Sequence, residues 1–133
     1  MKIKLSMQDI EKINLFSKLT RCNVVDCIDN DELCFVIEKG QYGLAVGKNG
    51  VVIKNVEHKF KKKIRLFEFS EDLREFAGNL VPEAENIRIN DNSVIFEVKN
   101  KDRAKVIGRM GHNINIIKTL LQRHFDIEDV KVK

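Results

Sequence analysis

Large apolar residues stand at every second position in two short stretches of the chain, at Leu33, Phe35 and Ile37 in one and at Val94, Phe96 and Val98 in the other. A period of two is typical of strands that bury one face. Behind each stretch, apolar residues recur at intervals of three or four, which indicates helices with one buried stripe. The two copies align at an offset of 61 residues, so that Gly47 falls on Gly108 and Gly50 on Gly111. The chain therefore contains an internal repeat.

Start and stop signals complete the elements of each copy. Ser6 and Asp9 have the spacing of a capping box, Ser70 is placed to cap the first helix of the second copy, and Pro82 ends that helix. We expect an α+β fold of two domains, 1–70 and 71–133. The first copy is predicted to contain helices 6–20, 40–46 and 51–61 and strands 23–28, 32–38 and 64–69. The second copy is predicted to contain helices 71–80, 101–107 and 112–124 and strands 86–90, 93–99 and 128–132.

Composition and length bound the class of protein. The 133 residues are 43% hydrophobic and 33% charged, as in globular chains, and no apolar run approaches the length of about 18 residues that crosses a bilayer. The start of the chain lacks the apolar segment of a secretory signal, so we expect a cytoplasmic protein without membrane contact. Cys22, Cys27 and Cys34 have neither a CxxC spacing nor a nearby histidine. We expect three reduced packing residues and no metal site.

Positive charge is concentrated around the two glycine pairs. The formal net charge is +4, and residues 1–70 hold the whole excess, with 13 basic and 9 acidic side chains against 11 of each in 71–133. Within 48–65, seven basic residues stand against the single acid Glu57, and a smaller basic group occupies 99–109. Such clusters predict a polyanion as partner. A solvated helix face is the alternative for each charge run taken by itself.

Each glycine pair stands in a turn between two predicted helices. In AVGKNGVVIKNV and VIGRMGHNINII, an apolar residue precedes GxxG, a cation follows the first glycine, and apolar residues stand three and six positions after the second. Glycine permits a tight reversal and a close approach of a nucleic-acid backbone, and free amides at the start of the next helix attract anions. We therefore expect Lys48 and Arg109 to contact phosphate. The alternative is a helix corner that needs glycine only for its geometry.

Signals of catalysis are weak. The segment GLAVGKN is similar to a phosphate-binding P-loop, but Gly43 and Gly47 are one residue too close for that motif and Asn49 replaces the hydroxyl that binds Mg²⁺. A predicted helix, rather than a strand, precedes the turn. The three histidines are scattered, and none is adjacent in sequence to a Ser or Cys nucleophile. We expect no enzyme activity, no small-molecule substrate and no cofactor.

The doubled pattern [IV]-G-[KR]-x-G-x-x-[IV] resembles the hallmark of KH domains, which are RNA-binding modules. The element order is similar to the type II KH fold, which implies for each copy a three-stranded sheet packed on one side by three helices. The tandem order also resembles the paired KH region of the NusA transcription factors, and the short chain looks like the archaeal NusA-like proteins. The resemblance implies a transcription termination or antitermination factor that binds single-stranded RNA. It leaves open whether RNA polymerase or other transcription factors are contacted.

The resemblance also implies where RNA is held. KH modules clamp the backbone of about four nucleotides and read bases on an apolar groove. We expect the first module to contribute more, because Asn115 stands where the first module has Lys54. The expected RNA contacts of the first module are Ala45, Val46, Gly47, Lys48, Asn49, Gly50, Ile53 and Lys54. Those of the second are Val106, Ile107, Gly108, Arg109, Met110, Gly111, His112 and Ile114.

Two other functions stay open at this point. KH modules also occur in proteins that bind ribosomal RNA or assemble ribosomes, and copurification with rRNA precursors would identify such a protein. The glycine turns would also serve to dock a protein partner. In that case, function would survive charge reversal of both turns.

Overall fold

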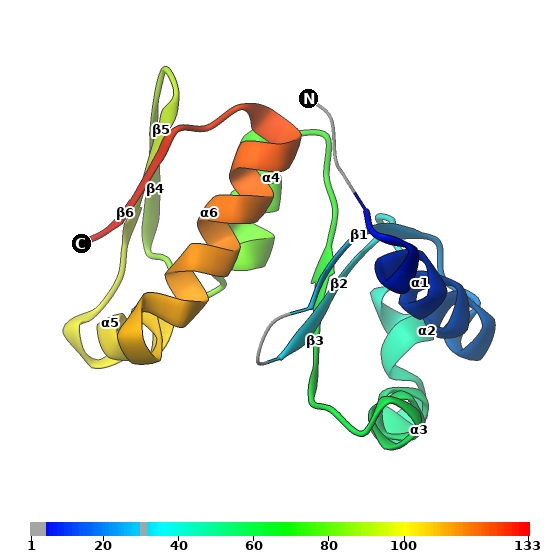
Figure 1. The fold of residues 1–133 in the computed structure, drawn as a ribbon. Coiled ribbons are helices and arrows are strands. Elements are labelled where there is room, and N and C mark those ends of the chain that lie inside the picture. Colours follow the sequence, from blue (N-terminus) through cyan, green and yellow to red (C-terminus); the bar gives the residue numbers. More distant parts are fainter. Residues whose placement is uncertain (1–4, 30–31) are drawn as a thin grey trace. The chain divides into compact units, whose positions relative to one another are not determined.

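The sequence repeat corresponds to two units with the same order of elements (Figure 1). The computed structural model describes residues 5–29 and 32–133. One unit ends at Ser70, and the other begins at Glu71. Each runs helix, strand, strand, helix, turn, helix, strand, which is the predicted order. The predicted α+β fold with two three-stranded sheets is confirmed.

The turn in each unit is a short 3₁₀ helix, labelled η. The elements of the first unit are α1 (Met7–Thr20), β1 (Val24–Asp29), β2 (Leu33–Ile37), α2 (Tyr42–Val46), η1 (Lys48–Gly50), α3 (Val51–Phe60) and β3 (Ile64–Glu68). Those of the second are α4 (Leu73–Leu80), β4 (Asn86–Asn90), β5 (Ser93–Glu97), α5 (Asn100–Ile107), η2 (Arg109–Gly111), α6 (His112–Phe125) and β6 (Asp129–Val132).

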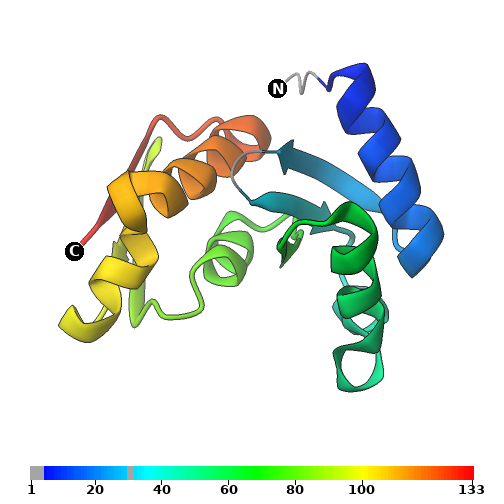
Figure 2. The ribbon, with the colours of Figure 1, turned by 60° about the horizontal axis from the view of Figure 1, so that its bottom comes forward.

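Both sheets combine an antiparallel pair with a parallel pair. β1 pairs antiparallel with β2, and β2 pairs parallel with β3, where Leu33 lies opposite Ile64. β4, β5 and β6 repeat this arrangement, with Val94 opposite Val130. Parallel neighbours need a crossover, which consists of α2, η1 and α3 in one unit and of α5, η2 and α6 in the other. Figures 1 and 2 show the three helices of each unit on one face of its sheet, as predicted. Each glycine turn therefore lies within a crossover.

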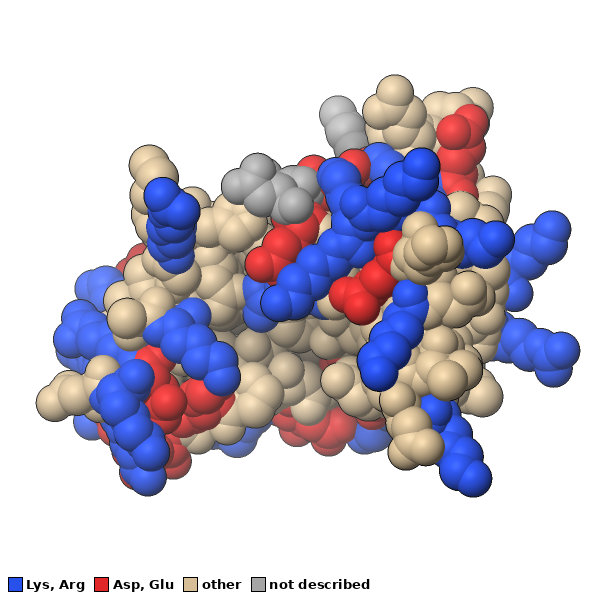
Figure 3. Space-filling model, turned by 90° about the horizontal axis from the view of Figure 1, so that it is seen from below, with Lys and Arg blue, Asp and Glu red and all other residues tan. Residues whose placement is uncertain are grey.

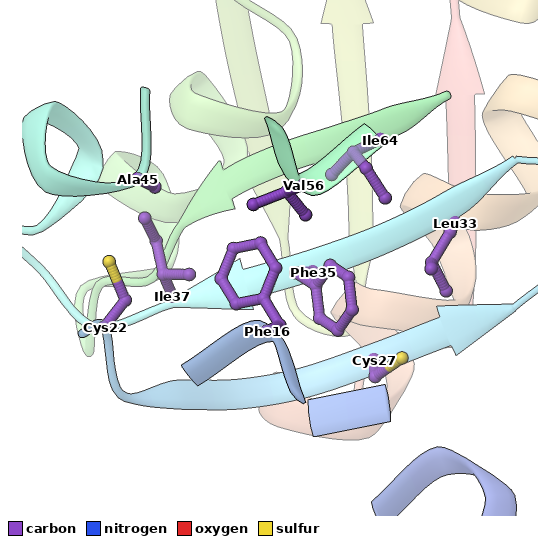
Figure 4. Packing of buried hydrophobic residues seen from close by; sticks show 9 residues of the cluster. All are labelled: Phe16, Cys22, Cys27, Leu33, Phe35, Ile37, Ala45, Val56 and Ile64. Carbon is purple, nitrogen blue, oxygen red and sulfur yellow. The ribbon is translucent and has the colours of Figure 1, made fainter. Parts of the chain in front are cut away.

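The core of the first unit lies between its sheet and its helices. Leu33, Phe35 and Ile37 are fully buried, and so are Cys34 and Val36 between them. Both faces of β2 are therefore buried, and the prediction of one buried face is wrong for this strand, whose intervening residues are apolar as well. The ring of Phe16 from α1 stacks on that of Phe35 with centroids 4.1 Å apart, and Val56 of α3 lies beside them (Figure 4). Burying each such side chain contributes about 1.5–3 kcal/mol. The crossover helices are thus fixed to the sheet from behind, which holds their connecting turn in place.

The second unit builds its core in the same way. Val94 and Phe96 of β5 are fully buried, and so are Ile117, Leu120 and Leu121 of α6. On α4, Phe76 is fully buried and approaches Phe125 with ring centroids 5.8 Å apart. The period-two alternation of β5 and the helical stripe of α6 therefore meet as predicted.

The capping box at the start of α1 is confirmed, whereas the predicted cap of α4 is wrong. Ser6 Oγ accepts a hydrogen bond from Asp9 N at 3.0 Å, and Ser6 N donates to the Asp9 carboxylate at 3.1 Å. At α4 the capping residue is Asp72, whose carboxylate accepts from Arg74 N at 3.3 Å. Asp caps a helix as well as Ser does, and the carboxylate two residues later displaces Ser70 from this role.

The other predicted bounds differ by one or two residues, and local geometry explains the larger differences. Helix α2 begins at Tyr42 instead of 40, because Gly40 has φ +87°, which no right-handed helix accommodates. Strand β5 ends at Glu97 instead of 99, because Lys99 is already the N-cap of α5. Val98 N still donates to Lys133 O at 2.9 Å, so the hydrogen bonding between the chain after β5 and the chain after β6 continues one residue past both strands.

Candidate functional site

The two glycine turns have nearly the same backbone. In the first, Gly47, Asn49 and Gly50 have φ values of 75°, 57° and 76°. In the second, Gly108, Met110 and Gly111 have 79°, 56° and 73°. Three of the four residues in each turn therefore have positive φ. The second and third of these are left-handed, which L side chains adopt at a cost of about 1–2 kcal/mol. The first glycine, with ψ 173° at Gly47 and 165° at Gly108, is in a region essentially restricted to glycine. The repeat predicted from the sequence extends to the individual dihedral angles.

The first glycine of each turn is required by contact as well as by conformation. A Cβ at Gly47 would lie 2.4 Å from Val52 Cγ2 and 2.9 Å from Val52 N. A Cβ at Gly108 would lie 2.6 Å from Asn113 Cβ and 2.7 Å from Asn113 N. Backbone cannot yield as a flexible side chain does, so any other residue would push the two helices apart. The turn is closed by the first glycine resting on the second residue of the following helix.

The second glycine of each turn is less crowded than the first and has only ordinary van der Waals neighbours. A Cβ at Gly50 or Gly111 would meet no atom closer than 3.8 Å. The amides of these glycines are used within the turn, since Gly50 N donates to Gly47 O at 3.2 Å and Gly111 N to Gly108 O at 3.1 Å. Neither α3 nor α6 has a side chain that caps its N-terminus. The first amide of each helix is engaged as well, since Val51 N donates to Lys48 O and His112 N to Arg109 O, so the predicted free amides are not found there. An anion that approaches over the second glycine meets the positive end of a helix dipole that no side chain caps.

The predicted site residues fall into three groups by exposure. Lys48, Asn49, Lys54, Arg109 and Met110 are exposed, and the Met110 side chain is 96% exposed. Ala45 and Val106 are buried, so they support the turns from below and offer no surface. The remaining predicted residues are half-buried and surround the turns: Val46, Gly47, Gly50, Ile53, Ile107, Gly108, Gly111, His112 and Ile114.

The cations of the turns face solvent without acidic neighbours. Across 5–29 and 32–133, neither Lys48 nor Arg109 lies within ion-pair distance of a carboxylate. By contrast, Lys105 on α5 pairs with Glu83 at 3.2 Å. Each turn thus combines half-buried apolar side chains, a helix N-terminus that no side chain caps and one cation, an arrangement suited to a phosphate with an adjoining base.

Comparison with known proteins identifies this arrangement. A family model described as KH domain matches residues 13–71 and, a second time, residues 68–133. The chain belongs to the KH domain family.

Proteins similar over nearly the full chain come from archaea. Proteins named "Probable transcription termination protein NusA" are 39% identical in Methanococcus vannielii, 33% in Methanocaldococcus jannaschii and 31% in Halococcus morrhuae. The alignments cover 99%, 98% and 99% of this chain and 80%, 75% and 99% of these relatives. The crystal structure of APE1850 is similar in fold, with a TM-score of 0.77 and 28% identity over 97% of this chain and 100% of that one.

The two KH units close their turns with different side chains. In the second unit, Asn113 Nδ2 donates to Val106 O at 2.8 Å, which ties the start of α6 to the end of α5. Val52 occupies the matching position of the first unit and packs against the core cluster. Sequence reasoning missed this role of Asn113. The signal was the pairing of Val with Asn directly behind two otherwise similar motifs.

The helices that precede the two KH turns also differ in character. On α2, Tyr42 and Leu44 are exposed by 48% and 53%. The matching residues on α5 are Arg103 and Lys105, both exposed. Among the described residues, Tyr42 is the only Phe or Tyr whose side chain is exposed to solvent. Sequence reasoning did not include Tyr42, although a lone tyrosine five residues before the turn was visible in the pattern.

Outside the glycine turns, the cysteines and the potential metal ligands show no sign of a reactive site in the described residues. Within residues 5–29 and 32–133, no three His, Cys, Asp or Glu side chains gather closely enough to hold a metal ion. The three cysteines are free and buried, as expected of packing residues. Burial raises the pKa of Cys27 to about 12 and that of Cys34 to about 11, so both thiols stay protonated at neutral pH. No helix in the described part of the chain is long and apolar enough to cross a membrane.

Proposed function

We propose that the chain is a non-enzymatic binder of single-stranded RNA that acts in transcription termination or antitermination. One observation carries the proposal: a glycine turn with the same backbone is built twice, and each time it presents an exposed cation beside a helix N-terminus that no side chain caps. A helix corner does not need the cation. The names of the archaeal relatives support a role in transcription.

In the proposed complex, the RNA backbone passes over the second glycine of each turn. A Cβ at Gly50 or Gly111 would meet only ordinary van der Waals contacts, none closer than 3.8 Å, and the positive N-terminal ends of α3 and α6 attract phosphate there. Lys48 and Arg109 add charge-assisted hydrogen bonds to neighbouring phosphate oxygens. An RNA strand bound this close to the turn would contact the half-buried apolar side chains beside it.

The bases would lie on those half-buried side chains. In the first unit these are Val46 and Ile53, with Lys54 at the edge, and in the second they are Ile107 and Ile114, with His112 at the edge. Ala45 and Val106 hold this floor from below. We place the boundary between the two KH domains at Ser70 and Glu71. Linkage of the two domains in one chain raises the effective concentration of the second for a strand that the first has bound.

Charge reversal in both turns tests the proposal. The variant carries Lys48→Asp, Asn49→Asp, Arg109→Asp and Met110→Asp, which places carboxylates where phosphates would bind. Asp tolerates the left-handed conformation of positions 49 and 110, and all four side chains are exposed, so the fold should survive. We expect the melting temperature to stay within a few degrees of the parent's and the affinity for single-stranded RNA to fall by at least about tenfold.

A matched control has the same change in charge elsewhere. Asn14→Asp, Lys18→Asp, Asn92→Asp and Lys133→Asp also alter exposed residues and also lower the net charge by six. If this control loses as much affinity as the turn variant, the effect is general electrostatics and the turns are structural corners. Crosslinking to cellular RNA then separates nascent transcripts from rRNA precursors as the bound class.

A further inference from the structure

The solvent face of α3 is a continuous stripe that begins at the first glycine turn. Its exposed residues recur at positions i, i+3, i+4, i+7 and i+8, the spacing of one helical face. They are Val51, Lys54, Asn55, His58 and Lys59. The stripe continues beyond the end of the helix into exposed Lys61, Lys62 and Lys63.

In the described part of the chain, only one lysine of this stripe, Lys62, is neutralised by a carboxylate. The one acid of the segment, Glu57, is half-buried and accepts a hydrogen bond from Ile64 N at 3.0 Å. Lys62 is engaged, because its Nζ lies 2.7 Å from Asp29 Oδ1. Asp29 also accepts from Lys12, and hydrogen bonds from these two lysines hold the pKa of the Asp29 carboxyl below its usual value. Among the described residues, Lys54, Lys59, Lys61 and Lys63 have no acidic partner.

Figure 3 looks onto the end of the molecule at which α3 lies in Figure 1, and Lys and Arg side chains project from the surface there. We call the four lysines Lys54, Lys59, Lys61 and Lys63 the lysine track. Helix α3 has ten residues, which corresponds to a length of about 15 Å. The far end of the track is therefore beyond the reach of a contact at the turn alone.

The corresponding helix of the second unit, α6, lacks the track; it has 14 residues and continues past the position at which α3 ends. Asn115 stands at the position of Lys54, and Leu120, which is fully buried, stands at that of Lys59. Gln122 and His124 stand at the positions of Lys61 and Lys63, and both are only half-exposed. The fold of the unit therefore does not require cations here. Their concentration in one copy needs a cause specific to that copy.

We propose that the lysine track binds the phosphates of an RNA strand that leaves the first glycine turn and runs along α3 toward Lys63. This proposal rests on the proposed function and assigns to the first unit a longer binding site than to the second. Lysines bind phosphates through charge alone, so the track adds affinity without reading sequence. A strand held only at the turn gains nothing from it.

A structural role makes a different prediction. Cations in the last turn of a helix stabilise its negative end, typically by 0.3–1 kcal/mol. Lys59 is in that last turn, and Lys61 is the C-cap. If this were the whole role of the lysines, their removal would lower the melting temperature slightly and leave RNA affinity at the level of a charge-matched control.

The test uses the full chain and two oligouridylates, one of about four nucleotides and one of about twelve. The variant carries Lys59→Gln, Lys61→Gln and Lys63→Gln, and leaves both glycine turns and Lys54 unchanged. The control carries Arg88→Gln, Lys131→Gln and Lys133→Gln, which removes three exposed cations from the strands and C-terminus of the second unit. Affinity is measured by anisotropy of labelled RNA at several salt concentrations, and stability by thermal melting.

We expect the variant to lose at least about tenfold in affinity for the long oligonucleotide and to keep its affinity for the short one. The slope of log affinity against log salt should fall by about 2 for the long one, at about 0.7 per phosphate contact removed. Equal losses of affinity for the short and the long oligonucleotide would overturn the proposal. So would a variant whose affinity for the long oligonucleotide matches that of the control. If the parent binds neither oligonucleotide, the proposed function itself fails, and the track fails with it.

Discussion

The two glycine turns share a backbone, and the surfaces around them have opposite arrangements of charge. In the first unit, the unpaired cations follow the turn, on α3 and beyond it, and the helix before the turn exposes Tyr42 and Leu44. In the second unit, Lys101 and Arg103 precede the turn on α5, and the helix after it begins with half-buried side chains. The geometry of the turn is therefore fixed separately from the chemistry of its surroundings.

The fixed part is small. It consists of the contact between the first glycine and the second residue of the following helix, together with three residues of positive φ. Everything outside that contact can change without moving the backbone. Two copies that share this element can therefore differ in the extent of the phosphate-binding surface around it. The following predictions test that difference.

The largest effect is expected from the first glycine of either turn. Gly108 has φ 79° and ψ 165°, a region that is essentially restricted to glycine, and an added Cβ would lie 2.7 Å from Asn113 N. Backbone strain and overpacking each cost about 1–3 kcal/mol, so Gly108→Ala should lower the free energy of unfolding by roughly 2–6 kcal/mol. Urea unfolding measures this change.

Gly111→Ala is the matched control. It has φ 73° and ψ 13°, which is the ordinary left-handed region, and its nearest contact would be at 3.8 Å. We expect a cost of only about 1–2 kcal/mol. Equal costs for the two alanines would show that the contact with Asn113 does not close the turn.

A smaller effect is expected when the two turns are compared as RNA contacts. Lys48→Asp with Asn49→Asp should reduce RNA affinity by about tenfold, or 1.4 kcal/mol, and Arg109→Asp with Met110→Asp should reduce it less. The reason is that the first turn continues into Lys54 and the other cations of α3, whereas the second has Asn115 at that place. Titration of labelled RNA at fixed salt measures both losses. Reversed losses would contradict the ranking.

The single tyrosine sharpens this experiment. The chain contains one Tyr and no Trp, so its intrinsic emission comes from Tyr42, in the helix before the first turn. RNA bound at the first turn should change this emission in the parent and in the Arg109→Asp, Met110→Asp variant. If RNA changes the Tyr42 emission of the parent but not that of the Arg109→Asp, Met110→Asp variant, binding at the first turn depends on the second, and RNA enters through the second unit.

Much of the fold could be predicted because periodicity is a local property. The alternation in β5 and the stripes of α3 and α6 are set by which side chains avoid water, whereas β2 is buried at all five positions because Cys34 and Val36 are apolar too. The predicted cap at Ser70 failed because Asp72 offers an equally good acceptor, which no local rule ranks. The bond from Asn113 to Val106 O links residues on opposite sides of the turn, so it depends on dihedral angles that the sequence does not display.

The exchange of Val52 and Asn113 should produce an effect of about 1 kcal/mol. Asn113→Val removes the hydrogen bond to Val106 O at 2.8 Å and leaves a part-buried carbonyl without that donor, which typically costs 0.5–1.5 kcal/mol. The turn itself should persist, because Val occupies this position in the first unit. Chemical unfolding measures the loss, and the RNA affinity of the variant should stay unchanged. An unchanged stability would mean that the second unit does not depend on this link.

The smallest effect is expected at the third position of the turns, where the first unit has Asn49 and the second Met110. Both residues are left-handed, with φ 57° and 56°, and Asn adopts this conformation more readily than a long apolar side chain does. Met110 is 96% exposed, so its replacement removes no buried contact. Met110→Asn should therefore raise the free energy of unfolding by about 0.5 kcal/mol, and Asn49→Met should lower it by a similar amount. Paired urea titrations of the two variants and the parent measure shifts of this size. Shifts of the same sign would show that side-chain contacts, and not the shared left-handed backbone, decide which residue each turn accepts.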